Sequence, residues 1–171
     1  MKGDKVYLRP LERNDLNILN TWKNDKEIYQ YLGGGFHPVS MDQHEKWLDS
    51  LIDMTGSNQR YMIRSCQEEK SVGMVGLYGI NWIHRTAEIG LFIGSKEARN
   101  KGFATESYKL LESYALNFLN LRKLTLKVVD ENQAAVSLWR KLGFSKVGCL
   151  HDERYINGAY KDVLIMEKFI Q

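Results

Sequence analysis

Alternation of apolar with polar or small residues predicts most of the strands in this chain. The clearest case is 87–94, where Ala87, Ile89 and Leu91 would share one face and Glu88 and Gly90 the other. Pro10 ends the first strand and marks it as an edge strand. Asn157-Gly158 is typical of a hairpin turn. Strands are expected at 6–10, 60–66, 72–80, 87–94, 124–129, 145–156 and 159–169.

Apolar spacing of three and four residues predicts four helices. The first is capped by Asn14 or Asp15, and the second opens with a capping box from Ser40 to Gln43. A long helix is expected from about Gly102 to Asn120. A short helix is expected to begin after the cap residue Asn132 and to end at Gly143. The first two helices would bury Leu16, Leu19, Trp22 and then His44, Trp47, Leu48, Leu51, Ile52.

The order of these elements is β-α-α-β-β-β-α-β-α-β-β, which predicts an α+β fold. Hairpin-like connections favour a mostly antiparallel central sheet flanked by helices, and the strand–helix–strand unit over 87–129 is a candidate parallel crossover. At 171 residues the chain is expected to form a single domain over 1–171.

Composition excludes several function classes. The chain has 24 Lys and Arg against 21 Asp and Glu, a net charge of +3, which is too weak for the dense basic face of a nucleic-acid binder. No apolar run approaches the roughly 20 residues that span a bilayer, and the start shows no secretory signal. Two cysteines indicate a reducing, cytoplasmic setting. The scattered histidines show no metal-ligand spacing, so no metal is expected.

The stretch from 88 to 106 suggests an anion site. A strand runs into a turn that holds Arg99, Lys101, Gly102 and Ala104, and a helix follows. Unpaired amides at a helix N-terminus attract anions, and a glycine lets a pyrophosphate approach them. The motif is neither a P-loop nor a dinucleotide fingerprint, and a solvated loop before a helix explains the stretch equally well.

Two motifs in order resemble the GNAT superfamily of acyl-CoA-dependent N-acetyltransferases. Arg99-x-x-Gly102-x-Ala104 is similar to its R/Q-x-x-G-x-G/A motif, and Asn132-x-x-Ala135 with Gly143-Phe144 is similar to its N-x-x-A-x-x-L-Y-x-x-x-G-F segment. The resemblance covers nearly the whole chain. The opening Leu8-Arg9-Pro10 and the closing 158–162 resemble most the branch that acetylates ribosomal-protein N-termini and bacterial polyamines such as spermidine.

The resemblance implies a position for acetyl-CoA. The cosubstrate would lie where the strand at 87–93 splays from the strand at 124–129, with main-chain groups of the first strand along the pantetheine arm and the amides of 101–105 on the pyrophosphate. Asn132 would bond near the pantetheine. The expected cosubstrate-binding residues are Leu91, Phe92, Ile93, Arg99, Asn100, Lys101, Gly102, Phe103, Ala104, Thr105 and Asn132.

The chemistry of acetyl transfer indicates which residues are candidates for catalysis. An amine attacks a thioester as the free base, so the site needs a proton acceptor. Glu88 is the best candidate for this acceptor. A surface carboxylate or an amine-binding carboxylate explains Glu88 equally well. Trp139 stands where the family keeps a tyrosine that protonates the thiolate. An indole does not release a proton near neutral pH, which favours a packing role for Trp139. Tyr155 is one candidate to protonate the thiolate in its place, and Ser137 and Tyr160 are others.

The acceptor is the least defined part of the prediction. Glu27, Tyr29 and Tyr31 are candidate substrate-binding residues, although a solvated helix end explains them as well. The acceptor can be a protein N-terminus, a polyamine or an aminoglycoside-like amine. A homo-oligomer is also possible. The alternative function is a CoA-binding regulatory or assembly module with little or no turnover.

Overall fold

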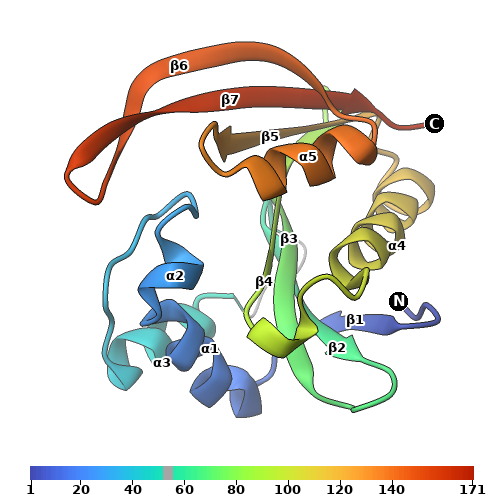
Figure 1. The fold of residues 1–171 in the computed structure, drawn as a ribbon. Coiled ribbons are helices and arrows are strands. Elements are labelled where there is room, and N and C mark those ends of the chain that lie inside the picture. Colours follow the sequence, from blue (N-terminus) through green and yellow to red (C-terminus); the bar gives the residue numbers. More distant parts are fainter. Residues whose placement is uncertain (52–55) are drawn as a thin grey trace.

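Seven strands form one sheet in the computed structural model, which describes residues 1–51 and 56–171 (Figure 1). The strand order is β1-β2-β3-β4-β5-β7-β6, so β1 is an edge strand as predicted. Every neighbouring pair is antiparallel except β4 and β5, which confirms the predicted parallel crossover. The strands are β1 (Val6–Pro10), β2 (Gln59–Ser65), β3 (Ser71–Asn81), β4 (Thr86–Ile93), β5 (Lys123–Val129), β6 (Ser145–Ile156) and β7 (Ala159–Phe169).

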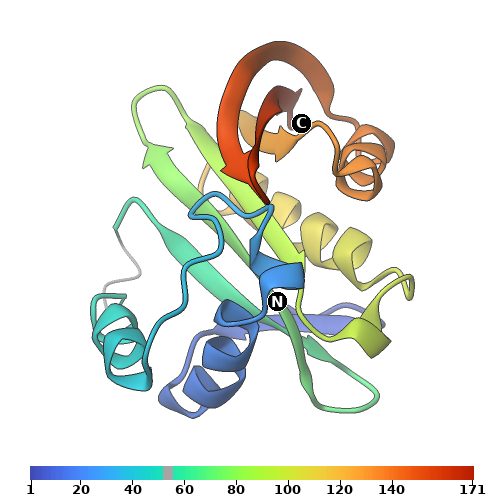
Figure 2. The same ribbon diagram turned by 60° about the vertical axis from the view of Figure 1, so that its left-hand side comes forward.

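Helices cover both faces of this sheet (Figures 1 and 2). On one face lie α1 (Leu16–Lys23), α2 (Lys26–Tyr29) and α3 (Met41–Asp49), and on the other lie α4 (Phe103–Asn117) and α5 (Gln133–Lys141). Each face has its own apolar core, because strand side chains alternate between the two sides. Ala87 and Ile89 belong to the core under α4, whereas Phe92 packs with the core under α1.

Local signals placed most helix ends correctly. The capping box forms, with the Ser40 hydroxyl accepting from the Gln43 amide at 3.2 Å and the Gln43 side chain accepting from the Ser40 amide at 2.8 Å. Asn132 caps α5 by accepting from the Ala135 amide at 3.4 Å. Gly143 follows α5 with a φ of 93°, the left-handed conformation expected of a glycine after a helix.

Three details differ from the sequence prediction. Asp15 precedes α1, but its carboxylate accepts from Arg9 at 2.7 and 2.8 Å and from the Glu12 amide at 2.8 Å instead of capping that helix. The helix α2 was not predicted, because a single turn is too short to show periodicity. Helix α3 ends at Asp49, so Leu51 lies beyond it, and Ile52 lies outside the described residues.

The long hairpin of β6 and β7 arches beside β5 and reaches back to the segment after α2 (Figure 1). Near its tip, the Arg154 guanidinium donates to the Tyr31 carbonyl at 2.8 Å, and the Asn157 amide donates to Gln30 at 2.8 Å. Asn157 and Gly158 have φ values of 52° and 83°, as the predicted Asn-Gly turn requires. Among the described helices, none is long and apolar enough to cross a membrane.

Candidate active site

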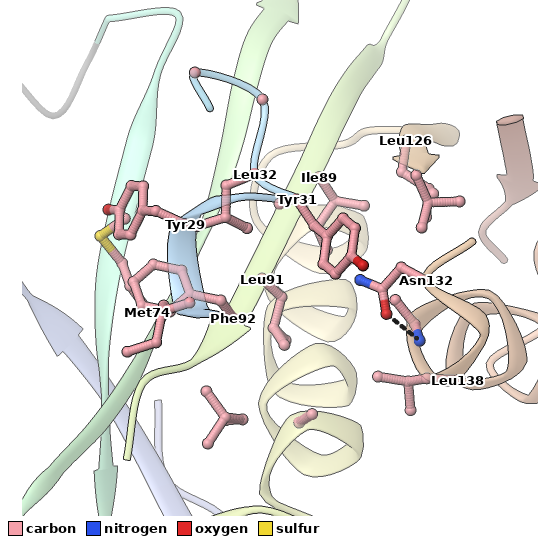
Figure 3. Close-up of a pocket in the computed structure, with 18 of the residues that line it drawn as sticks. Tyr29, Tyr31, Leu32, Met74, Ile89, Leu91, Phe92, Leu126, Asn132 and Leu138 are labelled. Carbon is pink, nitrogen blue, oxygen red and sulfur yellow. Dashed lines mark hydrogen bonds between the residues drawn. The ribbon is translucent and has the colours of Figure 1, made fainter. Parts of the chain in front are cut away.

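The parallel strands β4 and β5 separate after three paired residues. Pairing runs from Thr86 with Lys123 to Glu88 with Thr125, and the rest of β4 has no β5 neighbour. A cavity of about 1100 Å³ lies at this splay, lined by both strands and by the segments that follow them (Figure 3). The predicted gap between the two strands is therefore present, with the first turns of α4 and α5 beside it.

One part of the lining, which we call the turn half, is formed by the end of β4 and the starts of α4 and α5. Gly102 precedes α4 with a φ of 82°, a conformation that costs other residues strain. The first amides of α4 have no acceptor within the helix, so they are free to bind an anion. The turn half contains Leu91, Phe92, Ile93, Arg99, Asn100, Gly102, Phe103, Ala104, Thr105 and Asn132, all of them predicted.

Lys101 is the predicted cosubstrate residue that does not line the cavity. Its ammonium pairs with Glu68 at 3.7 Å, and its carbonyl accepts from the Lys5 side chain at 3.1 Å. The left-handed conformation of Asn100, with a φ of 60°, accompanies this arrangement. The side chain of Lys101 is therefore engaged away from the cavity, while the predicted contact of its main-chain amide with the pyrophosphate stays a prediction.

The other part of the lining, which we call the aromatic half, lies between the sheet and the helices α1 to α3. Tyr29 packs edge-on against Phe92 with ring centroids 5.5 Å apart. Burial raises the pKa of Tyr29 to about 12, so its hydroxyl stays protonated at neutral pH. The aromatic half contains Lys23, Glu27, Tyr29, Tyr31, Gln43, His44, Trp47, Arg60, Tyr78, Glu88 and Arg154.

The three predicted substrate residues all line the aromatic half. Glu27 is exposed and pairs with Lys96 at 2.6 Å, so its carboxylate is already engaged. The Tyr31 hydroxyl donates to Glu131 at 3.2 Å, and Tyr31 and Asn132 reach toward each other from opposite walls (Figure 3). These side chains therefore meet at one cavity, as predicted.

Glu88 is the last residue of β4 that pairs with β5, at the vertex of the splay. It is exposed to the cavity and lies opposite Tyr78 on β3. Burial lowers the pKa of Arg154, and the nearby Glu88 carboxylate partly offsets that effect. The vertex thus holds a carboxylate where both halves of the cavity meet.

Trp139 and Tyr155, the other two predicted catalytic residues, differ in position. Trp139 is buried and packs edge-on against Tyr108 and Phe144 at 5.9 and 5.3 Å, while one side lines the cavity. Its contacts are those of the expected packing role. Tyr155 does not line the cavity: it is 67% exposed and contacts Tyr160 near the hairpin tip. Its predicted catalytic role is therefore not supported by its position.

Sequence reasoning assigned no site role to several side chains of the aromatic half, among them Lys23, Arg60, Tyr78 and Arg154. They come from α1, β2, β3 and β6, so no local motif joins them. A usable signal was the pair of strand glycines, Gly76 and Gly90, because glycine within a strand marks close approach. A Cβ at either position would lie 2.9 to 3.0 Å from Tyr78.

The structure also groups Cys149, His151 and Asp162, which the spacing of metal-ligand motifs did not indicate. Their ligand atoms lie within 4.8 Å of one another on the β6–β7 hairpin. Asp162 accepts from the Asp152 amide at 2.9 Å, where Asp152 has a φ of 52°. The carboxylate thus supports the irregular β6 backbone, which accounts for its position.

Comparisons with known proteins agree with the geometry. The acetyltransferase (GNAT) domain family matches residues 5–145. Spermidine N(1)-acetyltransferase of Escherichia coli K12 is 37% identical over 161 residues, covering 94% of this chain and 84% of that protein. A crystal structure of spermidine N-acetyltransferase from Vibrio cholerae in complex with CoA and spermine has a TM-score of 0.90 at 34% identity, covering 97% of this chain and 96% of that one.

A dodecameric structure of the Vibrio cholerae enzyme matches with a TM-score of 0.82 at 33% identity, covering 96% of this chain and 94% of that one. These relatives confirm the resemblance drawn from the two sequence motifs, including its polyamine branch. The splayed parallel strands and the glycine turn are the two features that the resemblance implied for the acetyl-CoA site. The chain is therefore a member of the GNAT family of N-acetyltransferases.

Proposed function

We propose that this chain transfers the acetyl group of acetyl-CoA directly to the primary amine of an acceptor. The observation that carries the proposal is one cavity with an anion-binding turn in one half and the Glu88 carboxylate where the halves meet. The turn suits the pyrophosphate of a CoA thioester, and the carboxylate suits an amine that must lose a proton.

The turn half has the features that acetyl-CoA requires. The left-handed Gly102 exposes the first amides of α4, and Arg99 adds positive charge to hold the pyrophosphate. Beyond Glu88, the β4 edge that faces the gap has no neighbouring strand, so the main chain of Leu91–Ile93 is free to bond the amides of the pantetheine arm. Asn132, which lines the same half, would bond near that arm.

Glu88 is proposed as the proton acceptor. A lysine-like ammonium has a pKa near 10.4, so few such amines are neutral at pH 7. The carboxylate takes the proton, directly or through water, as nitrogen forms its bond to the acetyl carbon and the carbon–sulfur bond breaks. A backbone N–H of the strand 91–93 is the proposed donor to the oxyanion. Direct attack needs no covalent enzyme intermediate.

The leaving thiolate does not require a strong acid, because a thiol pKa lies near 8.5. The indole of Trp139 offers a hydrogen bond but no proton at neutral pH. We therefore assign Trp139 to packing beside the reacting end of the cosubstrate.

The relatives' names make spermidine and spermine the first polyamine acceptors to test. A protein N-terminus and an aminoglycoside-like amine are the other acceptors kept from the sequence prediction. We also propose that residues 1–171 act as one domain and that the protein forms homo-oligomers, which the dodecameric relative supports.

The test is release of CoA thiol from acetyl-CoA against a panel of amines, with Glu88→Gln as the diagnostic variant. We expect amine-dependent release by the wild type, and a kcat for Glu88→Gln lower by about 10²- to 10⁴-fold, the usual contribution of a general base. The matched control is Glu153→Gln, an exposed carboxylate that does not line the cavity; it should retain wild-type rates.

Calorimetry should show unchanged acetyl-CoA affinity in Glu88→Gln, which separates catalysis from binding. Saturable acetyl-CoA binding without thiol release for any amine would favour the alternative of a CoA-binding module. A wild-type kcat in folded Glu88→Gln protein would remove Glu88 from the mechanism.

A further inference from the structure

The charged side chains around the cavity are mostly basic. Among the described residues, two acids line it, and one of these, Glu27, is paired with Lys96. An acceptor with several ammonium groups would bring more positive charge to a lining that is already positive. The basic lining residues are Lys23, Arg60, Arg99, Lys127 and Arg154.

Arg60 lies close to two aromatic rings in the aromatic half. Its guanidinium carbon lies 4.9 Å from the centroid of the Tyr78 ring and 5.6 Å from that of Trp47. Rings fix the plane of a guanidinium through its faces, whereas its N–H donors point outward along the edges. Arg60 also hydrogen-bonds the Tyr78 hydroxyl. Within the described chain, no carboxylate forms an ion pair with Arg60, so its remaining N–H donors suit an oxyanion from a ligand.

Lys23 adds a second cation at this end of the cavity. Its ammonium lies 4.3 Å from the centroid of the Tyr29 ring, and burial lowers its pKa. Burial, and to a smaller extent the Lys23 charge, lowers the pKa of His44, which favours the neutral imidazole. As for Arg60, no carboxylate among the described residues forms an ion pair with Lys23, so a bound oxyanion would supply one.

The strand register places Arg60 away from Glu88, the proposed proton acceptor. Arg60 lies opposite Gly76 on β3, and Gly76 lies opposite Gly90 on β4, two residues along the strands from the pair of Tyr78 and Glu88 and therefore on the same face of the sheet. The backbones of β2 and β4 are two strand spacings apart, about 10 Å. The Tyr78 ring lies over the two glycines as a floor between Arg60 and Glu88. A small molecule could thus place one group at each end.

We propose, on the basis of the acetyl transfer proposed above, that the acceptor carries an oxyanion as well as its amine. The oxyanion, a carboxylate or a phosphate, binds Arg60 and Lys23 while the amine faces Glu88. The aromatic half is then selective against polycations, in contrast to what the relatives' names suggest for their own acceptors.

The test uses acceptor pairs that differ in charge at one end. The first pair is 4-aminobutanoate and 1,4-diaminobutane, and the second is glucosamine 6-phosphate and glucosamine, so that the two pairs separate a carboxylate from a phosphate. Spermidine completes the panel. In the wild type, we expect kcat/KM for the anionic member of at least one pair to exceed that of its match by tenfold or more.

Arg60→Met keeps the apolar stem and removes the charge, and it should abolish that preference mainly through KM. Arg60→Lys should restore part of it. The matched control is Arg64→Met on the same strand, whose guanidinium bonds Tyr7 outside the cavity; its preference should equal that of the wild type. A higher kcat/KM for spermidine than for every anionic amine, unchanged in Arg60→Met, would overturn the inference and leave the proposed transferase function intact.

Calorimetry with the CoA-loaded protein distinguishes the two failures. If no amine is acetylated but the anionic members bind in an Arg60-dependent manner, the transferase proposal fails and the oxyanion site stands. If the anionic members neither react nor bind to the CoA-loaded protein, the oxyanion site is wrong.

Discussion

The two halves of the cavity are built in different ways. The turn half is largely main chain: the free edge of β4, the left-handed Gly102 and the first amides of α4. The aromatic half is made of side chains such as Lys23, Arg60 and Tyr78, which come from separate elements. A binding site made from backbone leaves a short local motif, whereas a site made from distant side chains leaves none. This difference explains why the cosubstrate is easier to predict than the acceptor.

The largest expected effect tests whether the turn half depends on its backbone. Gly102→Asp and Gly102→Asn introduce side chains of equal size, and both residue types tolerate a positive φ better than most. A Cβ at residue 102 would meet only the flexible end of Lys5, at 3.2 Å, so the variants should fold. We expect Gly102→Asp to weaken acetyl-CoA binding by at least about a hundredfold through repulsion of the pyrophosphate.

Calorimetric titration with acetyl-CoA measures this effect, and Gly102→Asn is the control for backbone strain and size. Its loss of affinity should be clearly smaller. Equal affinities for the wild type and a folded Gly102→Asp protein would mean that the phosphates bind elsewhere.

A second, smaller effect tests whether Trp139, which lines the cavity on α5 beside the turn half, takes part in chemistry. Trp139→Phe keeps an aromatic ring and removes the indole N–H. Because Trp139 packs against Tyr108 and Phe144, we expect a lower free energy of unfolding, by about 1–3 kcal/mol, with little loss of kcat. Urea denaturation and kcat at saturating acetyl-CoA measure the two quantities.

Trp139→Tyr supplies the phenol that the family usually carries and serves as the comparison variant. A fall in kcat of a hundredfold or more in folded Trp139→Phe, about 2.7 kcal/mol, would show that the indole acts in the transition state. The turn half would then no longer be described by main chain and packing alone.

The smallest effect concerns the cations of the aromatic half. Burial and the Lys23 ammonium lower the pKa of His44, so the folded state favours the neutral imidazole. Below the ordinary histidine pKa of about 6.5 the unfolded chain binds the proton more readily, and the free energy of unfolding should fall as pH drops. Denaturation midpoints at pH 7.5 and 5.5 should differ less in His44→Gln than in the wild type.

The control for this pH effect is His84→Gln, since His84 is exposed on the β3–β4 connection. It should retain the pH dependence of the wild type. An unchanged pH dependence in His44→Gln would mean that neither burial nor the Lys23 ammonium lowers the pKa of His44.

The sequence by itself predicted the seven strands, the capping box at Ser40 and the Asn-Gly hairpin, because each depends on residues that are neighbours in the chain. For the same reason it located the turn at Gly102 and the cap at Asn132. The helix α2 escaped prediction, since one turn carries too few residues for a periodic signal.

Only the tertiary structure decided which side chains line the aromatic half. It removed Tyr155 from the cavity, turned Lys101 toward Glu68, and brought Arg60 from β2 next to Tyr78 from β3. Such contacts depend on strand register and on the packing of helices over the sheet, which short-range patterns do not encode. The main chain of the turn half is therefore visible in the sequence, whereas the charge that a substrate meets in the aromatic half appears only once the strands are paired.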